Sequence, residues 1–223
     1  MLFRSIAGWA PRVKVQGIVR SSEASQGVMI TGIDPGREKG VSDIFNYMLN
    51  TEGSEFLDNP EAGDVLVSEK LAAKLDVVTG DRIVVMFQDS RDEIAGEALT
   101  VRGIFRSPID SFDKYVIFTG IKKLQKAAGM NDRISEISIR TGTRDESTEV
   151  KSGISPFIKD PEVQAITWQE MAPSMMSAIR LYDAMMFIFF GIIFITVIFS
   201  VANTMIMAVM ERFHEIGVMK CIG

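Results

Sequence analysis

The sequence has little of the side-chain chemistry that most catalytic and metal sites need. Among its 223 residues there is one cysteine, Cys221, and one histidine, His214. A disulfide framework needs several cysteines, and two candidate ligands do not make a zinc site. The pattern GxxxxGK[ST] is also missing, so we do not expect this chain to bind ATP through a P-loop. The sequence therefore predicts no catalytic, cofactor-binding or metal-binding residue, which disfavours a membrane-anchored enzyme.

An excess of positive charge is also missing. The formal net charge is −5, and it lies in the first part of the chain, because Glu211, Arg212, Glu215 and Lys220 cancel near the end. A nucleic-acid partner would require a basic face, so we expect none. The third absence is local, since residues 184–210 contain no charged side chain at all.

This charge-free segment, AMMFIFFGIIFITVIFSVANTMIMAVM, has the length and composition of a membrane span. Its 27 residues would form a helix about 40 Å long, whereas the hydrocarbon core of a bilayer is about 30 Å thick. A buried core helix of a soluble protein is the alternative, but a helix this long usually carries some charge. We therefore predict a transmembrane helix over 184–210.

Polar residues within the segment follow a helical period. Thr196, Ser200, Asn203 and Thr204 are spaced i, i+4, i+7 and i+8, so they share one helix face. Such a face packs against other helices in lipid, although Ser and Thr can instead bond back to their own helix. We expect a bundle whose other helices lie outside this sequence, and we interpret the chain as a fragment.

Residues 1–167 are typical of a mixed α/β domain. The expected strands are 11–19, 28–33, 65–67, 82–87, 98–105, 115–118, 134–140 and 163–166, and the expected helices are 43–49, 69–75, one between Thr119 and Gly129, and one within 146–158. Ser42, Ser68 and Thr119 are expected to cap helices. Asp34-Pro35-Gly36 predicts a turn, and residues 89–93 a solvated hairpin end.

The junction of the two parts also carries a helix signal. Thr167-Trp-Gln-Glu170 is a capping box, and Pro173 is expected to kink or restart the helix soon after it. We predict a stalk helix over 168–183, along which an apolar stripe is formed by Met171, Met175, Ile179 and Tyr182. Such a stalk could transmit motion, or it could be a passive connection.

The final stretch, NTMIMAVMERFHEIGVMKCIG, resembles the FtsX-like permease segment of ABC transporters in the lipoprotein-releasing and macrolide-export superfamily. Phe213 and Cys221 depart from the family pattern. The stretches PRVKVQG, ITGIDPGRE, GDVLVSEKLAAKLDVVTGD and RGIF resemble the extracytoplasmic core of MacB-type members. The residues that match the tail pattern are Asn203, Thr204, Glu211, Arg212, Glu215, Ile216, Gly217, Lys220 and Gly223.

The resemblance implies an α+β extracytoplasmic domain with a mixed sheet and βαβ-like units, joined to a transmembrane helix and a coupling segment starting at 211–223. It implies a multi-pass protein of the bacterial inner membrane, whose missing helices are the first and the last two of four. The residues implied to contact a separate ATPase are Glu211, Arg212, His214, Glu215, Ile216, Gly217 and Lys220.

The implied partners are an ABC ATPase subunit that holds ATP and Mg²⁺, a second permease subunit (identical or different) and the bilayer. The resemblance of PRVKVQG and GIDPGRE to the lipoprotein-releasing branch adds a lipoprotein substrate and a periplasmic chaperone. Drug or peptide export and control of cell-wall hydrolases are the alternatives within the family. A single-pass membrane sensor is the alternative outside it, and it would need an output domain after Gly223.

Overall fold

The structure of the chain is a computed structural model that describes residues 5–49, 63–108, 113–143 and 146–222. The chain divides into two compact units, Met1–Pro156 and Phe157–Gly223. Each unit is described by itself.

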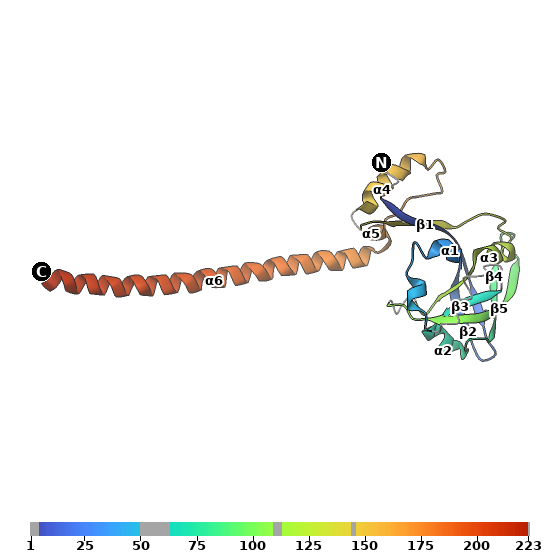
Figure 1. Cartoon of the computed structure of the whole chain (residues 1–223), viewed down its shortest axis with the longest axis horizontal. Coiled ribbons are helices and arrows are strands. Elements are labelled where there is room, and N and C mark those ends of the chain that lie inside the picture. Colours follow the sequence, from blue (N-terminus) through green and yellow to red (C-terminus); the bar gives the residue numbers. More distant parts are fainter. Residues whose placement is uncertain (1–4, 50–62, 109–112, 144–145, 223) are drawn as a thin grey trace. The chain divides into compact units, whose positions relative to one another are not determined.

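The first unit is built on a seven-stranded mixed sheet in the order β2-β6-β3-β5-β4-β1-β7 (Figure 1). Strand β1 pairs with β2 as well as with β4, so strands β1 to β6 close into a ring of pairings. The strands are β1 Ile6–Arg20, β2 Ser25–Ile33, β3 Asp64–Ser68, β4 Arg82–Gln88, β5 Ile94–Phe105, β6 Val116–Gly120 and β7 Glu136–Thr141.

Strand β1 is long enough to serve two parts of the sheet. Its first half pairs with β7, and its second half pairs with β2 on one side and β4 on the other. Gly17 lies in the doubly paired part, where a Cβ atom would come within 2.5 Å of the Met86 carbonyl oxygen. The expected alternation holds, because Val13 and Val19 are fully buried inside the ring.

Two helices complete the core. In α2 (Glu69–Leu75), Ser68 caps as predicted, because the Leu71 N–H donates to its Oγ at 3.3 Å. Helix α3 (Ile121–Ala127) packs on β2, and at Gly32 a Cβ would come within 3.1 Å of the helix backbone. Burying each core leucine contributes about 1.5–3 kcal/mol. The largest apolar core side chains are Ile30, Ile33, Leu66, Leu71, Leu75, Ile83, Phe105 and Ile117.

Several local predictions need correction. The Asp34-Pro35-Gly36 turn opens a short helix, α1 (Pro35–Glu38), in which Asp34 Oδ1 accepts the Gly36 N–H. Thr119 does not cap α3; it lies in β6 and its hydroxyl donates to the Asp64 carbonyl, while Gly120 is at the N-cap position. Gly129, with φ +62°, ends the turn after α3 as expected.

Three other segments differ in part from what was expected. The helix predicted over 43–49 is a 3-10 helix, η2 (Ile44–Tyr47), and α4 (Glu146–Ile154) is followed by η4 (Ser155–Phe157). Residues 163–166 form no strand, because their apolar side chains stay exposed with no strand paired to them in the part described.

The hairpin end at 89–93 is less solvated than predicted. Asp89 is buried, and its Oδ1 accepts the backbone N–H groups of Arg91 (2.8 Å) and Glu93 (3.0 Å). Ser90 Oγ donates to the Gly129 carbonyl at 2.8 Å, which fixes the hairpin to the end of α3. These backbone bonds, together with the Arg91 side chain, lower the pKa of Asp89 below its ordinary value.

The second unit contains two helices, α5 (Trp168–Met171) and α6 (Pro173–Ile222). The predicted capping box forms at the start of α5, where the Thr167 N–H donates to Glu170 Oε2 at 3.1 Å. The chain leaves helical geometry at Ala172 (φ −126°), and Pro173 restarts it at a position where its missing N–H costs nothing. Helix α6 then continues without interruption for 50 residues (Figure 1).

Candidate functional site

The first unit is entered and left by neighbouring strands. Ile6 pairs with Thr141 in the β1–β7 ladder, and the Gly142 N–H donates to the Ser5 carbonyl at 3.1 Å. The two ends of the folded sheet therefore meet at one place.

A partly buried ion-pair cluster, with Glu38 at its buried end, lies where the β1–β7 ladder ends. Arg12 of β1 makes a two-pronged contact with Glu38 of α1, in which Nε donates to Oε2 at 3.1 Å and Nη2 donates to Oε1. Arg12 Nη1 also donates to Glu136 Oε1 of β7 at 3.3 Å, and Lys14 Nζ reaches Glu136 Oε2 at 2.7 Å. We call Arg12, Lys14, Glu38 and Glu136 the clasp cluster. It joins the first strand, the helix after the second strand and the last strand.

Burial makes the cluster sensitive to loss of one member. The Glu38 side chain is 1% exposed and that of Arg12 is 20% exposed. Burial alone would lower the pKa of Arg12, but the hydrogen bonds and charges of Glu38 and Glu136 outweigh it and raise that pKa above its ordinary value. The Arg12 guanidinium therefore stays charged. A planar guanidinium fixes a carboxylate in both distance and orientation, so the contact sets how α1 lies on β1.

Two further contacts hold α1 and the turn after it on β1. The Arg37 guanidinium lies over the Trp9 ring, 4.1 Å from its centroid. At Gly8, a Cβ atom would come within 2.6 Å of the Gly40 carbonyl, so the two backbones approach closely here. The stretches PRVKVQG and ITGIDPGRE, which carried part of the family resemblance, lie against each other, because β1 pairs with β2 and Arg12 contacts Glu38.

Sequence reasoning did not identify the clasp cluster. Arg12 and Glu38 are 26 residues apart, and Arg12 and Glu136 are 124 apart, so no local spacing links them. The strand itself gives no signal either, because Lys14, Gln16 and Arg20 also alternate with its valines, so Arg12 does not stand out as an unusual charged residue.

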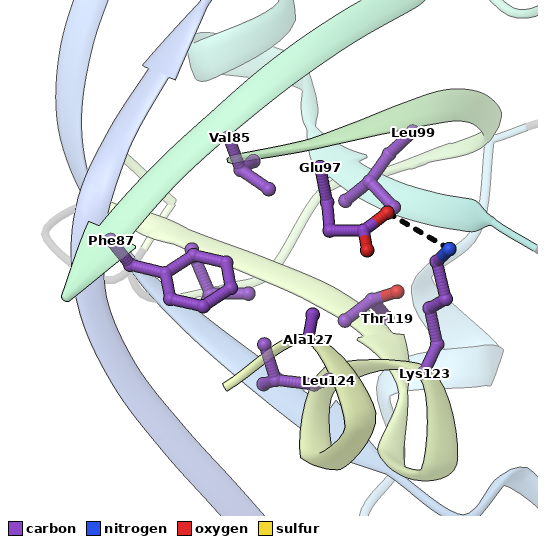
Figure 2. A pocket seen from close by; sticks show the side chains of 9 residues that line it. Val85, Phe87, Glu97, Leu99, Thr119, Lys123, Leu124 and Ala127 are labelled. Atoms are coloured by element: carbon purple, nitrogen blue, oxygen red, sulfur yellow. Dashed lines mark ion pairs between the residues drawn. The ribbon is translucent and has the colours of Figure 1, made fainter. Parts of the chain in front are cut away.

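One small cavity lies between the sheet and α3 (Figure 2). Apolar side chains from β4, β5 and α3 line it, among them Phe87, Leu99 and Leu124. The ion pair between Glu97 and Lys123, at 2.9 Å, lies at its edge. With about 10 Å³ available it has room for one water at most, so it is not a site for a ligand or substrate. No three metal-binding side chains gather anywhere in the described ranges.

Helix α6 carries the predicted membrane and coupling residues. It is long and apolar enough to be a candidate membrane span: its most apolar 18-residue window has a mean hydropathy of 2.7 and is not buried against the described part of the chain. At about 75 Å it exceeds the hydrocarbon core. Glu211, Arg212, Gly217 and Lys220 are exposed on it, and the backbone of 214–216, which includes His214, Glu215 and Ile216, is helical there. The coupling contact itself stays a prediction.

The predicted polar face on α6 has two kinds of member. Thr196 Oγ1 donates to the Ile192 carbonyl at 2.9 Å, and Thr204 Oγ1 donates to the Ser200 carbonyl at 3.0 Å, so both threonines bond back to their own helix. The Asn203 amide has no hydrogen-bond partner within the described chain. An unpaired amide in hydrocarbon is costly, so Asn203 is the residue of this face that most needs a neighbouring helix.

Comparison with known proteins agrees with this architecture. Residues 2–156 match the family model described as the MacB-like periplasmic core domain. The lipoprotein-releasing system transmembrane protein LolC of Neisseria meningitidis serogroup B is 20% identical over 99% of this chain, and the chain spans 54% of that protein's length.

Two solved structures show low similarity. The extracellular domain of the noncanonic ABC-type transporter YknZ from Gram-positive bacteria has a TM-score of 0.47 at 14% identity, covering 73% of this chain and 82% of that chain. The periplasmic region of MacB from Actinobacillus actinomycetemcomitans has a TM-score of 0.44 at 12% identity, covering 69% and 68%. Because the family model covers more than half of its residues, this chain belongs to the MacB-like periplasmic core domain family of ABC-transporter permeases.

Proposed function

We propose that this chain belongs to a permease subunit that couples ATP hydrolysis in a separate ATPase to motion of its periplasmic domain. One observation carries the proposal: α6 runs unbroken from Pro173, through the apolar segment, to Ile222. A displacement at the charged end of such a helix is carried along the helix as far as Pro173, beside the break at Ala172 that separates it from α5. The chain needs no nucleotide site for this role, since ATP and Mg²⁺ belong to the partner ATPase.

The proposed docking surface is the charged end of α6, where Glu211, Arg212, His214, Glu215, Ile216, Gly217 and Lys220 lie. Both signs of charge are present there, which suits complementary pairing across an interface. An added Cβ at Gly217 meets nothing within 4 Å among the residues that the structure describes. The glycine therefore serves no packing need within the chain, and close approach of a partner backbone explains it.

We further propose that the transported cargo is a lipoprotein released toward the outer membrane with the help of a periplasmic chaperone. The relative named as a lipoprotein-releasing protein aligns along 99% of this chain, which supports this substrate class over drug or peptide export. The protein would then lie in the bacterial inner membrane as a pair of permease subunits.

The test is uncoupling. In the full-length protein reconstituted with its ATPase, replacing Glu215-Ile216-Gly217 by Ala-Ala-Pro should abolish ATP-dependent release of an acylated protein from proteoliposomes. The periplasmic domain should stay folded, as judged by its protease resistance. Arg180→Glu is the control, because it changes an exposed charge on α6 outside the docking surface. Unchanged release by the triple variant would refute the coupling role, and equal release of a non-acylated protein would refute the substrate class.

A further inference from the structure

Strand β7 combines a free edge with an exposed apolar face. It is the last strand of the sheet, and within the ranges described no strand pairs with its outer edge. Trp9 pairs with Ile139 and Pro11 with Ile137, so these four side chains share one face of the ladder. Trp9, Ile137 and Ile139 are 48%, 54% and 38% exposed. An uncovered strand edge beside such a face is a natural site for a further strand.

The sequence of β7, Glu-Ile-Ser-Ile-Arg-Thr, is complementary to itself. If two copies pair antiparallel about Ser138, Glu136 of each copy lies opposite Arg140 of the other. Ile137 then lies opposite Ile139, and Ser138 lies opposite its own counterpart. Opposite charges and apolar pairs facing each other across strands are both stabilising. We propose that β7 pairs in this register with β7 of a second copy of this chain.

Other registers lose the complementarity. A shift by two residues places Glu136 opposite either Ser138 or Gly142, and both cross-copy charge pairs disappear. A shift by one residue puts a charged side chain opposite an isoleucine and turns the apolar faces to opposite sides of the joined sheet. The central register is therefore the one that these six residues specify.

The side chains of Arg140 and Glu136 are both partly exposed, so each can also contact a second copy. Arg140 is bonded to Asp43 at 3.3 Å, and its side chain is 45% exposed. The Glu136 side chain, although held by Arg12 and Lys14, is 31% exposed. In the paired form, apolar rows cross four strands. Each row contains Trp9 and Ile139 of one copy, followed by Ile137 and Pro11 of the other, so the joined sheet has one continuous apolar face.

Disulfide trapping tests this surface directly. The full chain is prepared in lipid nanodiscs on a Cys221→Ser background, which removes its native thiol. Because neither ATPase nor nucleotide is present, a negative result leaves the ATPase-coupling role untouched. Directly opposed residues in antiparallel strands have Cα atoms about 4.5–5.5 Å apart, within the range that a disulfide spans. Ser138→Cys should therefore form a disulfide-linked dimer on mild oxidation. Ala98→Cys, an exposed position in β5, is the matched control.

A charge swap tests the register. On the Ser138→Cys background, Arg140→Glu should lower the crosslinked fraction about tenfold, because both cross-copy charge pairs then become pairs of facing carboxylates. Mixing this chain with a Glu136→Lys chain should restore crosslinking between the two, since position 136 of each chain then faces a side chain of opposite charge at position 140 of the other, and both cross-copy pairs are attractive again. The Arg140→Glu result decides alone if the Glu136→Lys chain does not fold.

Three results would overturn the proposal. The first is an absence of Ser138→Cys dimers, and the second is equal crosslinking of the Ala98→Cys control. The third is a dimer that Arg140→Glu does not weaken. A Ser138→Cys adduct whose mass identifies a different protein, with no self-dimer, would assign the β7 edge to another partner and would also reject pairing between copies.

Discussion

Removal of the Arg12 guanidinium gives the sharpest test of the clasp cluster. Arg12→Met keeps most of the side-chain length but leaves the Glu38 carboxylate buried, with 1% of its side chain exposed, and without its partner. Breaking a buried pair in this way costs about 3–5 kcal/mol, a large share of a domain stability of about 5–15 kcal/mol. We therefore expect the free energy of unfolding of the first unit to fall by about that amount.

The assay is urea unfolding of the full chain in detergent, followed by the fluorescence of Trp9 on a Trp168→Phe background. Lys14→Met is the control, because Lys14 makes a more exposed pair at 2.7 Å with Glu136 and should cost about 1 kcal/mol or less. The double variant Arg12→Met/Glu38→Met should recover much of the loss, since no unpaired charge remains. The pairing of Arg12 with a buried Glu38 carboxylate would be contradicted if Arg12→Met lowered the unfolding free energy no more than Lys14→Met. Strictly additive losses in the double variant would contradict it too.

Other substitutions test separate parts of the structure. Gly17→Ala should destabilise the first unit by about 1–3 kcal/mol in the same urea assay, whereas Gly27→Ala, whose Cβ meets nothing within 4 Å, should not; equal effects would contradict the close strand contact. The lowered pKa of Asp89 means that its stabilising effect is complete above the unfolded pKa of about 3.9 and is lost as pH falls through the lower folded value. The unfolding free energies of wild type and Asp89→Asn should therefore converge below about pH 4, and a constant difference would exclude the effect. In a binding titration, Gly217→Ala should weaken binding of the ATPase without destabilising α6. Gly191→Ala on the same helix, where an added Cβ also meets nothing within 4 Å, should leave the affinity for the ATPase unchanged. Equal affinities of the two variants would contradict close approach of a partner backbone at Gly217.

Elements set by local signals could be predicted well from the sequence. The helix Glu69–Leu75 has the predicted bounds, because an N-cap serine and a short apolar period act within a few residues. The composition of 184–210 was likewise sufficient to predict the long apolar helix, which its length and hydropathy make a candidate membrane span. The family resemblance rested on short stretches, and the family assignment now rests on 2–156.

Features set by distant residues could not be predicted. The ring of strands closes because β1 pairs on both sides at once, and no period within β1 specifies two partners. Thr119 has the residue type of a helix cap, but pairing of β6 with its neighbours extends the strand to Gly120, so Gly120 takes the N-cap position and the Thr119 hydroxyl donates to the Asp64 carbonyl instead. The clasp cluster joins three chain segments, so only the folded sheet brings Arg12, Glu38 and Glu136 together.

The most direct test of the coupling role is to ask which ATPase binds the charged end of α6. The full-length permease is purified from its native membrane in the wild-type form and as Arg212→Glu/Lys220→Glu, with Arg180→Glu as the matched charge reversal on the same helix. We expect an ATPase with a P-loop to co-purify stoichiometrically with wild type and Arg180→Glu, and to be lost from the double variant. Stoichiometric recovery of the ATPase with the double variant, or no P-loop protein with wild type, would contradict it.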